Sequence, residues 1–257
     1  MKVVGLVSGG KDSCYNMCQC VNHGHVPVCV AQLVPPDGRD ELDSYMFQTV
    51  GHEAVPLISR ALCLPILRRT IAGYSVVCDM EYRPSEKDEV EDLYALMREA
   101  KQKYDIEAVS AGAICSQYQK ERIANVCERL DLDLLAYLWQ RDQTELLYEM
   151  LDAGMRAILV KTSSLGLDPF VHLGKELNEM LPHFLELNEK IFRQKLVVSN
   201  AEVAITNPLS GNEVPSYFVE LHFVFLVFDS SSVQESVLCS QHNGLYGTFR
   251  NAVFCFP

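Results

Sequence analysis

The residues best suited to chemistry lie at the start of the chain, where residues 8–13 read Ser-Gly-Gly-Lys-Asp-Ser. We call this run the SGGKDS loop. An apolar, β-branched segment at residues 2–7 precedes the loop, and a helix-compatible segment follows it. A strand, a glycine-rich turn and a helix in this order aim several backbone N–H groups at one point, which makes an anion site. Gly9 and Gly10 let the backbone approach a phosphate because they carry no Cβ.

The other members of the SGGKDS loop add hydroxyl groups and charges. Ser8 and Ser13 supply hydroxyl donors, and Lys11 supplies a cation. Asp12 is a carboxylate beside the expected phosphate, which fits a residue that holds Mg²⁺ or orients a nucleophile. The spacing does not fit the G-x-x-x-x-G-K-[ST] loop. We therefore predict a phosphate site of another type, with Asp12 as its metal ligand.

Composition limits the possible partners. The 257 residues contain 34 Asp and Glu against 22 Lys and Arg, a formal net charge of −12. This balance argues against direct binding of nucleic acid through its phosphates. The most apolar stretch, residues 217–228, is too short to span a membrane and contains Glu220 and His222. Without a basic and apolar leader before the first strand, we expect no targeting peptide and a cytoplasmic location.

Ten cysteines are present, and none of them forms a C-x-x-C pair. Without partners at metal-ligand spacing, packing as small apolar side chains explains them better than zinc or iron–sulfur binding. So many unpaired thiols suit a reducing compartment.

Apolar runs alternate with helical patterns along the first two thirds of the chain. Short, nearly continuous apolar strands separated by helices predict an α/β fold, a parallel-sheet nucleotide-binding domain of the Rossmann-like (HUP) type. The acid run at residues 86–92 fits the start of a helix capped by Ser85, a structural role. The expected strands are 2–7, 26–33, 65–70, 107–111, 134–137 and 156–161, and the expected helices are 11–22, 48–62, 86–103, 117–130 and 142–153.

The pattern changes after Lys161. A turn at residues 163–169 precedes helical segments at 172–181 and 183–190 and β-like runs at 195–206 and 216–228. We predict a nucleotide-binding domain at 1–164, a smaller, truncated α+β subdomain at 165–228, and a poorly ordered tail at 229–257.

Ligands of open parallel sheets bind beyond the carboxyl ends of the strands, so residues that follow the strands are candidates for the site. Trp139 suits stacking on a ligand, or it packs in a hinge between the subdomains. Lys120 and Arg122 are either solvated or directed at phosphate. Besides the SGGKDS loop, the predicted nucleotide-binding residues are Tyr118, Lys120, Arg122, Trp139, Arg141 and Asp168.

The SGGKDS loop matches the pyrophosphate-binding loop of the N-type ATP pyrophosphatases, and further blocks narrow the resemblance. The chain resembles the diphthine–ammonia ligase family over roughly residues 1–190. The blocks are DELDSYMFQTVGHEA (40–54), EVEDLY (89–94), GAICSQYQKERIANVC (112–127), AYLWQRD (136–142) and LGLDPFVHLGK (165–175).

This resemblance implies amidation of diphthine on elongation factor 2, with ATP and Mg²⁺ as cofactors and ammonium as nitrogen source. ATP would convert the carboxylate to an acyl-adenylate, and ammonia would then release AMP after pyrophosphate has left. Lys11 and Asp12 would be the catalytic residues, Lys11 neutralising pyrophosphate and Asp12 positioning Mg²⁺. The nucleotide would bind to the whole SGGKDS loop, namely Ser8, Gly9, Gly10, Lys11, Asp12 and Ser13.

One departure from the family pattern affects the expected activity. Family members follow the helix that ends near Lys190 with a strand and a Gly/Glu-rich loop of the type EGGEYETF, which helps to form the substrate site. Here residues 190–192 run directly into residues 193–198, which resemble the strand after that loop. We therefore expect nucleotide binding with impaired amidation. The alternatives are a non-catalytic nucleotide-binding isoform and another N-type adenylating enzyme, such as an RNA-modifying one.

Overall fold

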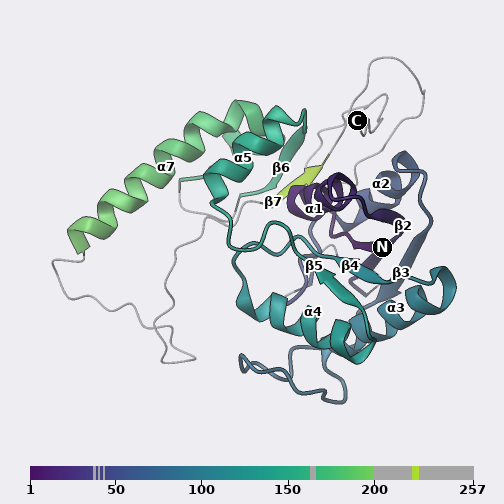
Figure 1. Ribbon diagram of the computed structural model, residues 1–257. Coiled ribbons are helices and arrows are strands. Elements are labelled where there is room, and N and C mark those ends of the chain that lie inside the picture. Colours follow the sequence, from purple (N-terminus) through teal and green to yellow (C-terminus); the bar gives the residue numbers. More distant parts are fainter. Residues whose placement is uncertain (37–38, 40, 43, 163–165, 199–221, 226–257) are drawn as a thin grey trace.

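The computed structural model describes residues 1–36, 39, 41–42, 44–162, 166–198 and 222–225, with residues 191–198 and 222–225 described by their backbone alone (Figure 1). The expected tail at 229–257 and most of the expected strand at 195–206 lie outside these residues. In the described part, no helix is both long and apolar enough to cross a membrane.

Five parallel strands form the central sheet. In spatial order they are β3 (Ile66–Thr70), β2 (Val26–Val34), β1 (Lys2–Leu6), β4 (Ala108–Ser110) and β5 (Asp133–Leu135). The middle residues of β1 and all of β4 are buried, as expected for strands covered on both faces. The structure confirms the predicted parallel α/β fold.

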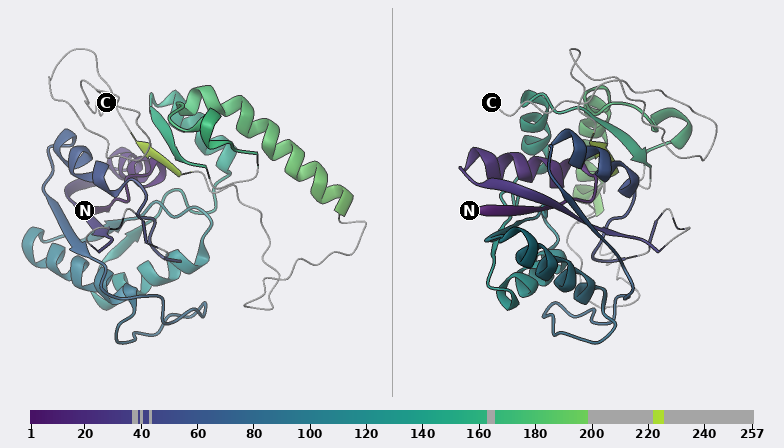
Figure 2. Two further views of the ribbon diagram at one scale, coloured as in Figure 1. Left: turned by 180° about the vertical axis from the view of Figure 1, so that it is seen from behind. Right: turned by 90° about the vertical axis from the view of Figure 1, so that its right-hand side faces the viewer.

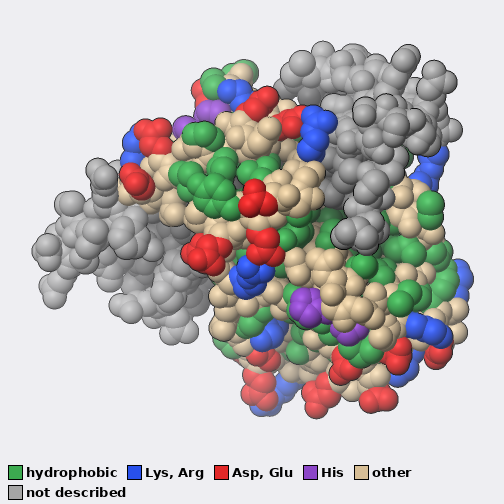
Figure 3. Space-filling view, turned by 45° about the horizontal axis from the view of Figure 1, so that its top comes forward, with side chains coloured by type: hydrophobic (Ala, Val, Ile, Leu, Met, Phe, Trp, Pro, Cys, Tyr) green, Lys and Arg blue, Asp and Glu red, His purple; other side chains and the backbone are tan. Residues whose placement is uncertain are grey.

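Helices cover both faces of this sheet (Figures 1 and 2). One face packs against α3 (Glu89–Tyr104) and α4 (Gln117–Arg129). The other face packs against α1 (Lys11–Asn22), α2 (Val55–Ala61) and α5 (Gln143–Asp152), with the short 3₁₀ helix η1 (His52–Ala54) before α2. On the face shown in Figure 3, the basic side chains of the described residues are scattered among acidic ones.

Four of the described cysteines lie in the core, as expected for small apolar side chains, whereas Cys63, Cys78 and Cys115 are exposed and do not fit that expectation. The four in the core are Cys14, Cys20, Cys29 and Cys127. Burial raises the pKa values of the Cys29 and Cys127 thiols to about 12. Among the described residues, no group of three His, Cys, Asp or Glu side chains could hold a metal ion.

The sixth predicted strand does not join the central sheet, which corrects the sequence-based expectation. β6 (Ala157–Lys161) pairs antiparallel with β7 (His222–Phe225), and β7 also lies beside α1. Only alternate residues of β6, Ala157 and Leu159, are fully buried, and they pack with Leu147 of α5 and with α7 (Leu177–Val198). A strand with one buried face suits a two-stranded antiparallel sheet better than the middle of a parallel one. The domain division at residue 164 stays a prediction.

The helices after β6 also differ from the prediction. A single turn, α6 (Pro169–His172), precedes α7, and α7 is one helix that runs through Pro182 and residues 195–198, where a strand was expected to begin. No glycine or further proline interrupts the sequence between Pro182 and Val198, and Lys190 pairs with Glu186 one turn before it. Because nothing stops the helix at Lys190, it continues into the segment that resembles a strand.

The acid run at residues 86–92 has the structural role that its sequence indicates, but Asp88 rather than Ser85 caps the helix. The Val90 N–H donates to the Asp88 carboxylate at 3.0 Å. Lys87 has a φ of 69°, so the chain turns just before α3, and Asp88 rather than Ser85 meets the first free N–H groups of the helix.

A charged pair joins α3 to α4 and makes the stability depend on pH. Arg129 donates to both oxygens of Glu91 at 2.8 and 2.7 Å, and these bonds hold the pKa of Glu91 below its ordinary value of 4.5. The native state therefore binds this proton less readily than the unfolded state does. The stabilisation is complete above that ordinary value and is lost as the pH falls through the lower native pKa.

We expect Glu91→Gln to lower the free energy of unfolding by about 1 kcal/mol at neutral pH. Between about pH 6 and about pH 3, the wild-type chain should lose more stability than the variant, because only the wild type loses this pair. Urea unfolding across this range measures both effects, and parallel curves for the two chains would contradict the assignment.

Candidate functional site

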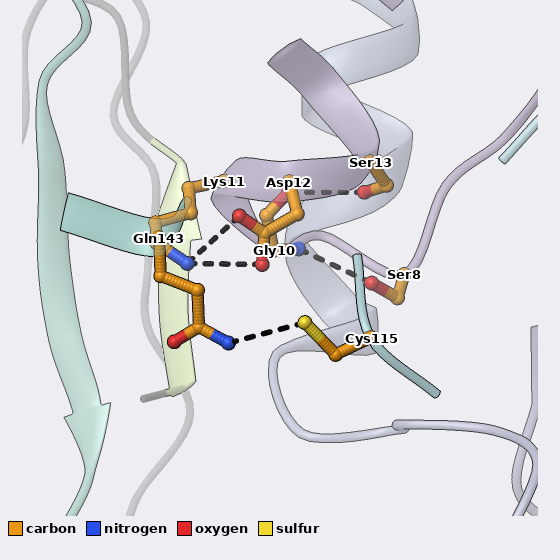
Figure 4. A network of polar contacts seen from close by, with 7 residues as sticks. All are labelled: Ser8, Gly10, Lys11, Asp12, Ser13, Cys115 and Gln143. Carbon is orange, nitrogen blue, oxygen red and sulfur yellow. Dashed lines mark hydrogen bonds and ion pairs between the residues drawn. The ribbon is translucent and has the colours of Figure 1, made fainter. Parts of the chain in front are cut away.

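The SGGKDS loop joins β1 to the start of α1 (Figure 4). Gly10 is the N-cap of α1, and no side chain caps the first turn of the helix. The first N–H groups of α1 therefore point at the place where an anion would bind. Gly9 has a φ of 96°, and a Cβ there would lie 2.9 Å from the carbonyl oxygen of Gly51. Glycine is thus required at this position by both conformation and space.

Charged side chains flank this backbone. The Lys11 ammonium contacts both carboxylate oxygens of Asp12 at 2.8 and 2.9 Å. The Lys11 side chain is 9% exposed, whereas Asp12 is 30% exposed. The hydroxyl of Ser13 donates to the Gly10 carbonyl at 3.0 Å, and the Gly10 N–H donates to Ser8 Oγ at 3.4 Å. The loop thus holds a sheltered cation and a more accessible carboxylate next to each other.

The loop sits where the strand order reverses. β1 lies between β2 and β4, so the connections that follow β1 and β4 leave the sheet edge in opposite directions. Open α/β sheets bind their ligands in the crevice at this switch point. The connection that follows β4 packs closely against the start of α1, because a Cβ on Gly112 would lie 2.5 Å from the Ser13 nitrogen. The signal for Gly112 in the sequence is its place just after a strand.

The fold also pairs Cys115 with Gln143. The Gln143 amide, in the first turn of α5, donates to Cys115 Sγ at 3.8 Å, and Figure 4 draws this pair with the loop residues. Cys115 is exposed and lies in the connection that begins at Gly112. Neither residue type is distinctive in a sequence, so only the fold reveals this contact.

Tyr118 and Arg122 share the start of α4 with Lys120, but their partners lie in the segment that follows β3. The Arg122 side chain is fully buried and donates to the carbonyls of Val77 and Asp79 at 2.5 and 2.9 Å. Its guanidinium stacks 3.2 Å from the Tyr118 ring, and the Tyr118 hydroxyl donates to the same Val77 carbonyl. Both side chains therefore fasten the segment after β3 in this structure, so Arg122 is not solvated.

Lys120 and Trp139 come together at the carboxyl edge of the sheet. The Lys120 ammonium lies 4.3 Å from the centre of the Trp139 ring, a cation–π contact. The structure thus joins two predicted site residues that are 19 positions apart in the sequence. Whether a ligand stacks on Trp139 stays a prediction.

Known proteins resemble this chain over most of its length. The family described as the diphthamide synthase N-terminal domain matches residues 1–134. A diphthine–ammonia ligase of Danio rerio is 57% identical over 192 residues, which cover 74% of this chain and 75% of that protein. The same enzyme of Bos taurus is 47% identical over 247 residues, covering 86% of this chain and 92% of that protein. The chain belongs to the diphthine–ammonia ligase family. It is therefore an enzyme of the ligase class.

The matches to other diphthine–ammonia ligases also show a gap. The bovine match extends over 247 residues but covers only 86% of this chain, about 221 residues, so about 26 of its positions have no counterpart here. The zebrafish match extends over 192 residues and covers about 190 residues of this chain, so it is almost free of gaps.

Two further predicted site residues of this diphthine–ammonia ligase family member have partners of their own. Arg141 donates to both oxygens of Glu149 at 3.2 and 2.5 Å, and Glu149 also accepts a hydrogen bond from the Tyr15 hydroxyl of α1 at 2.7 Å. The network links α5 to the helix that starts at the SGGKDS loop. Asp168 caps α6 by accepting the Phe170 N–H at 2.8 Å. Their contacts with a nucleotide stay predictions.

Proposed function

We propose that this chain uses ATP to activate the carboxylate of diphthine on elongation factor 2 and passes the acyl group to ammonia, in the cytoplasm. The SGGKDS loop at the switch point is the observation that carries the proposal. Family membership supports the substrate, because the names of the relatives include both diphthine and ammonia.

The chemistry explains why a phosphate loop is needed. A carboxylate is a poor acyl donor because its leaving group would be an oxide or hydroxide. In the proposed reaction a carboxylate oxygen attacks the α-phosphorus of ATP, and pyrophosphate leaves. Ammonia then attacks the acyl carbon of the adenylate, AMP leaves with the bonding electrons, and the nitrogen gives up a proton. The products are the amide, AMP and pyrophosphate.

The described residues fit ATP and Mg²⁺. The uncapped first turn of α1 would accept the pyrophosphate oxygens, and Lys11 would offset their charge. Asp12 would hold Mg²⁺, because one carboxylate together with phosphate oxygens is a usual set of ligands for this ion. Bound Mg²⁺ would replace the Lys11 ammonium as the partner of at least one Asp12 oxygen.

A second candidate function has support from the gap of about 26 positions. A chain that lacks part of the substrate site could bind the nucleotide without completing the reaction. In that case the chain is a nucleotide-binding isoform of the ligase.

The test is to incubate the chain with diphthine-bearing elongation factor 2, ATP, Mg²⁺ and ammonium. We expect AMP and pyrophosphate to form together with the amide, and Asp12→Ala to reduce the rate at least about 100-fold through loss of the metal. Mass spectrometry of the protein substrate and chromatography of the nucleotides measure the products. ADP in place of AMP would overturn the adenylation step. Nucleotide binding without any amide would favour the isoform.

A further inference from the structure

We propose that Asp88 and Glu89, at the start of α3, are positioning residues that fix a wall for the protein substrate beside Tyr118. This inference rests on the proposed function. The wall consists of residues 44–47, which follow β2 in sequence, and residues 74–80, which follow β3. Both segments lie beyond the carboxyl ends of their strands, at the edge of the sheet that carries the SGGKDS loop.

Glu89 ties the two segments together. Its side chain belongs to a residue only 1% exposed, and its two oxygens accept the hydroxyls of Ser44 and Ser75 at 2.7 and 2.6 Å. Ser44 Oγ in turn accepts the N–H groups of Met46 and Phe47 at 3.0 and 2.8 Å. A single buried carboxylate therefore sets the conformation of one segment and the place of the other.

Asp88, also at the start of α3, holds the segment at residues 74–80 through hydrogen bonds. One carboxylate oxygen accepts the N–H groups of Val76 and Val77 at 3.0 and 2.9 Å, while the other caps the helix. The segment also passes close to the helix, because a Cβ on Gly73 would lie 2.7 Å from the Lys87 carbonyl oxygen. The backbone of residues 73–77 is thus held along most of its length.

Both segments held by these two carboxylates contact the start of α4. The carbonyl of Val77, whose N–H bonds to Asp88, accepts the Tyr118 hydroxyl at 3.2 Å. Tyr45, next to Ser44, meets the Tyr118 ring edge-on with 6.3 Å between the ring centres. The Gln119 amide donates to the Met46 carbonyl at 3.1 Å. Asp88 and Glu89 therefore act on Tyr118 through the two segments.

The fastened segments carry large side chains that face solvent. Tyr45 is 68% exposed, Tyr74 62% and Val76 40%. Burying a carboxylate is costly, and hydrogen bonds from hydroxyl and N–H groups only offset that cost. Aromatic side chains held rigidly at a surface are typical of contacts with another protein. We therefore assign this wall to the protein that presents the reacting carboxylate.

The test measures the binding of two ligands by the full chain, ATP and diphthine-bearing elongation factor 2. In Glu89→Gln and Ser75→Ala, we expect the affinity for the protein to fall at least about tenfold, because ordered aromatic anchors dominate such contacts. The affinity for ATP should stay within about twofold, because the SGGKDS loop is unchanged and the Tyr118 ring keeps its stacking on Arg122. Ser75→Thr, which keeps the hydroxyl, should restore binding of the protein.

Asp92→Asn is the matched control. Asp92 lies on the same helix, is largely buried, and accepts the N–H groups of Ala72 and Gly73 at 2.8 and 2.9 Å, so it fastens the same chain before the wall begins. The inference would be overturned if Asp92→Asn and Glu89→Gln lost equal affinity for the protein. It would also be overturned if the affinities for the protein and for ATP fell in parallel. Unchanged binding by Glu89→Gln would also overturn it. If the wild-type chain does not bind the protein, the proposed function fails as well.

Discussion

Gly10→Val should weaken the binding of ATP at least about 100-fold without unfolding the chain. Gly10 has φ and ψ of −76° and 156°, an extended conformation that valine adopts readily. The substitution should therefore impair ATP binding rather than folding, since a branched side chain would occupy the space that a phosphate needs next to the backbone. Isothermal titration with ATP, with circular dichroism as a check of folding, measures the loss.

The dependence on Mg²⁺ separates this steric effect from an electrostatic one. The loss in Gly10→Val should be the same with and without Mg²⁺, because the obstruction does not involve the ion. Asp12→Ala should also weaken the binding of ATP, but mainly when Mg²⁺ is present, because the substitution removes the proposed metal ligand. Unchanged ATP affinity in both variants would remove the SGGKDS loop from the site.

The second large effect concerns the segment that is expected to be missing after Lys190. We expect the chain to amidate diphthine at least about 100-fold more slowly than the zebrafish relative, because imprecise placement of reacting groups costs rates of this order. Its affinity for ATP should be similar, since the SGGKDS loop precedes the gap. Rates measured at saturating ATP and ammonium, with both enzymes on the same protein substrate, test this expectation.

A restored chain serves as the control for this prediction. Inserting the corresponding segment of the relative after Lys190 should raise the rate toward that of the relative, because α7 would then end where the family pattern ends it. Equal rates for the original chain and the relative would show that the segment is dispensable. A restored chain that binds ATP but stays slow would place the defect elsewhere in the chain.

Much of the parallel α/β fold could be predicted because its signals are local. The apolar run of β1, the glycines after it and the helical spacing of residues 11–22 lie within 22 consecutive residues. The bounds predicted for this helix agree with those of α1. Parallel pairing also follows from the alternation of strands with helices. The order of the strands, which places the SGGKDS loop at the switch point, does not follow from these local signals.

Prediction failed where several competing contacts are possible. β6 has a strand-like sequence, but its pairing with β7 depends on α7, which buries one face of it. Residues 195–198 look like a strand, yet they extend a helix that nothing interrupts. In both places the local preference is weak, so packing partners decide the outcome.

The sequence by itself determined the family, the strand, turn and helix around the SGGKDS loop, and the parallel sheet, because these depend on residue types at short, fixed spacings. Only the tertiary structure decided which side chains share a site. Glu89 meets Ser44 and Ser75 from two other connections, Gly112 meets the start of α1, and Arg122 turns away from solvent to bind backbone carbonyls. Such contacts join residues up to about 100 positions apart, and the close packing of the whole chain selects them.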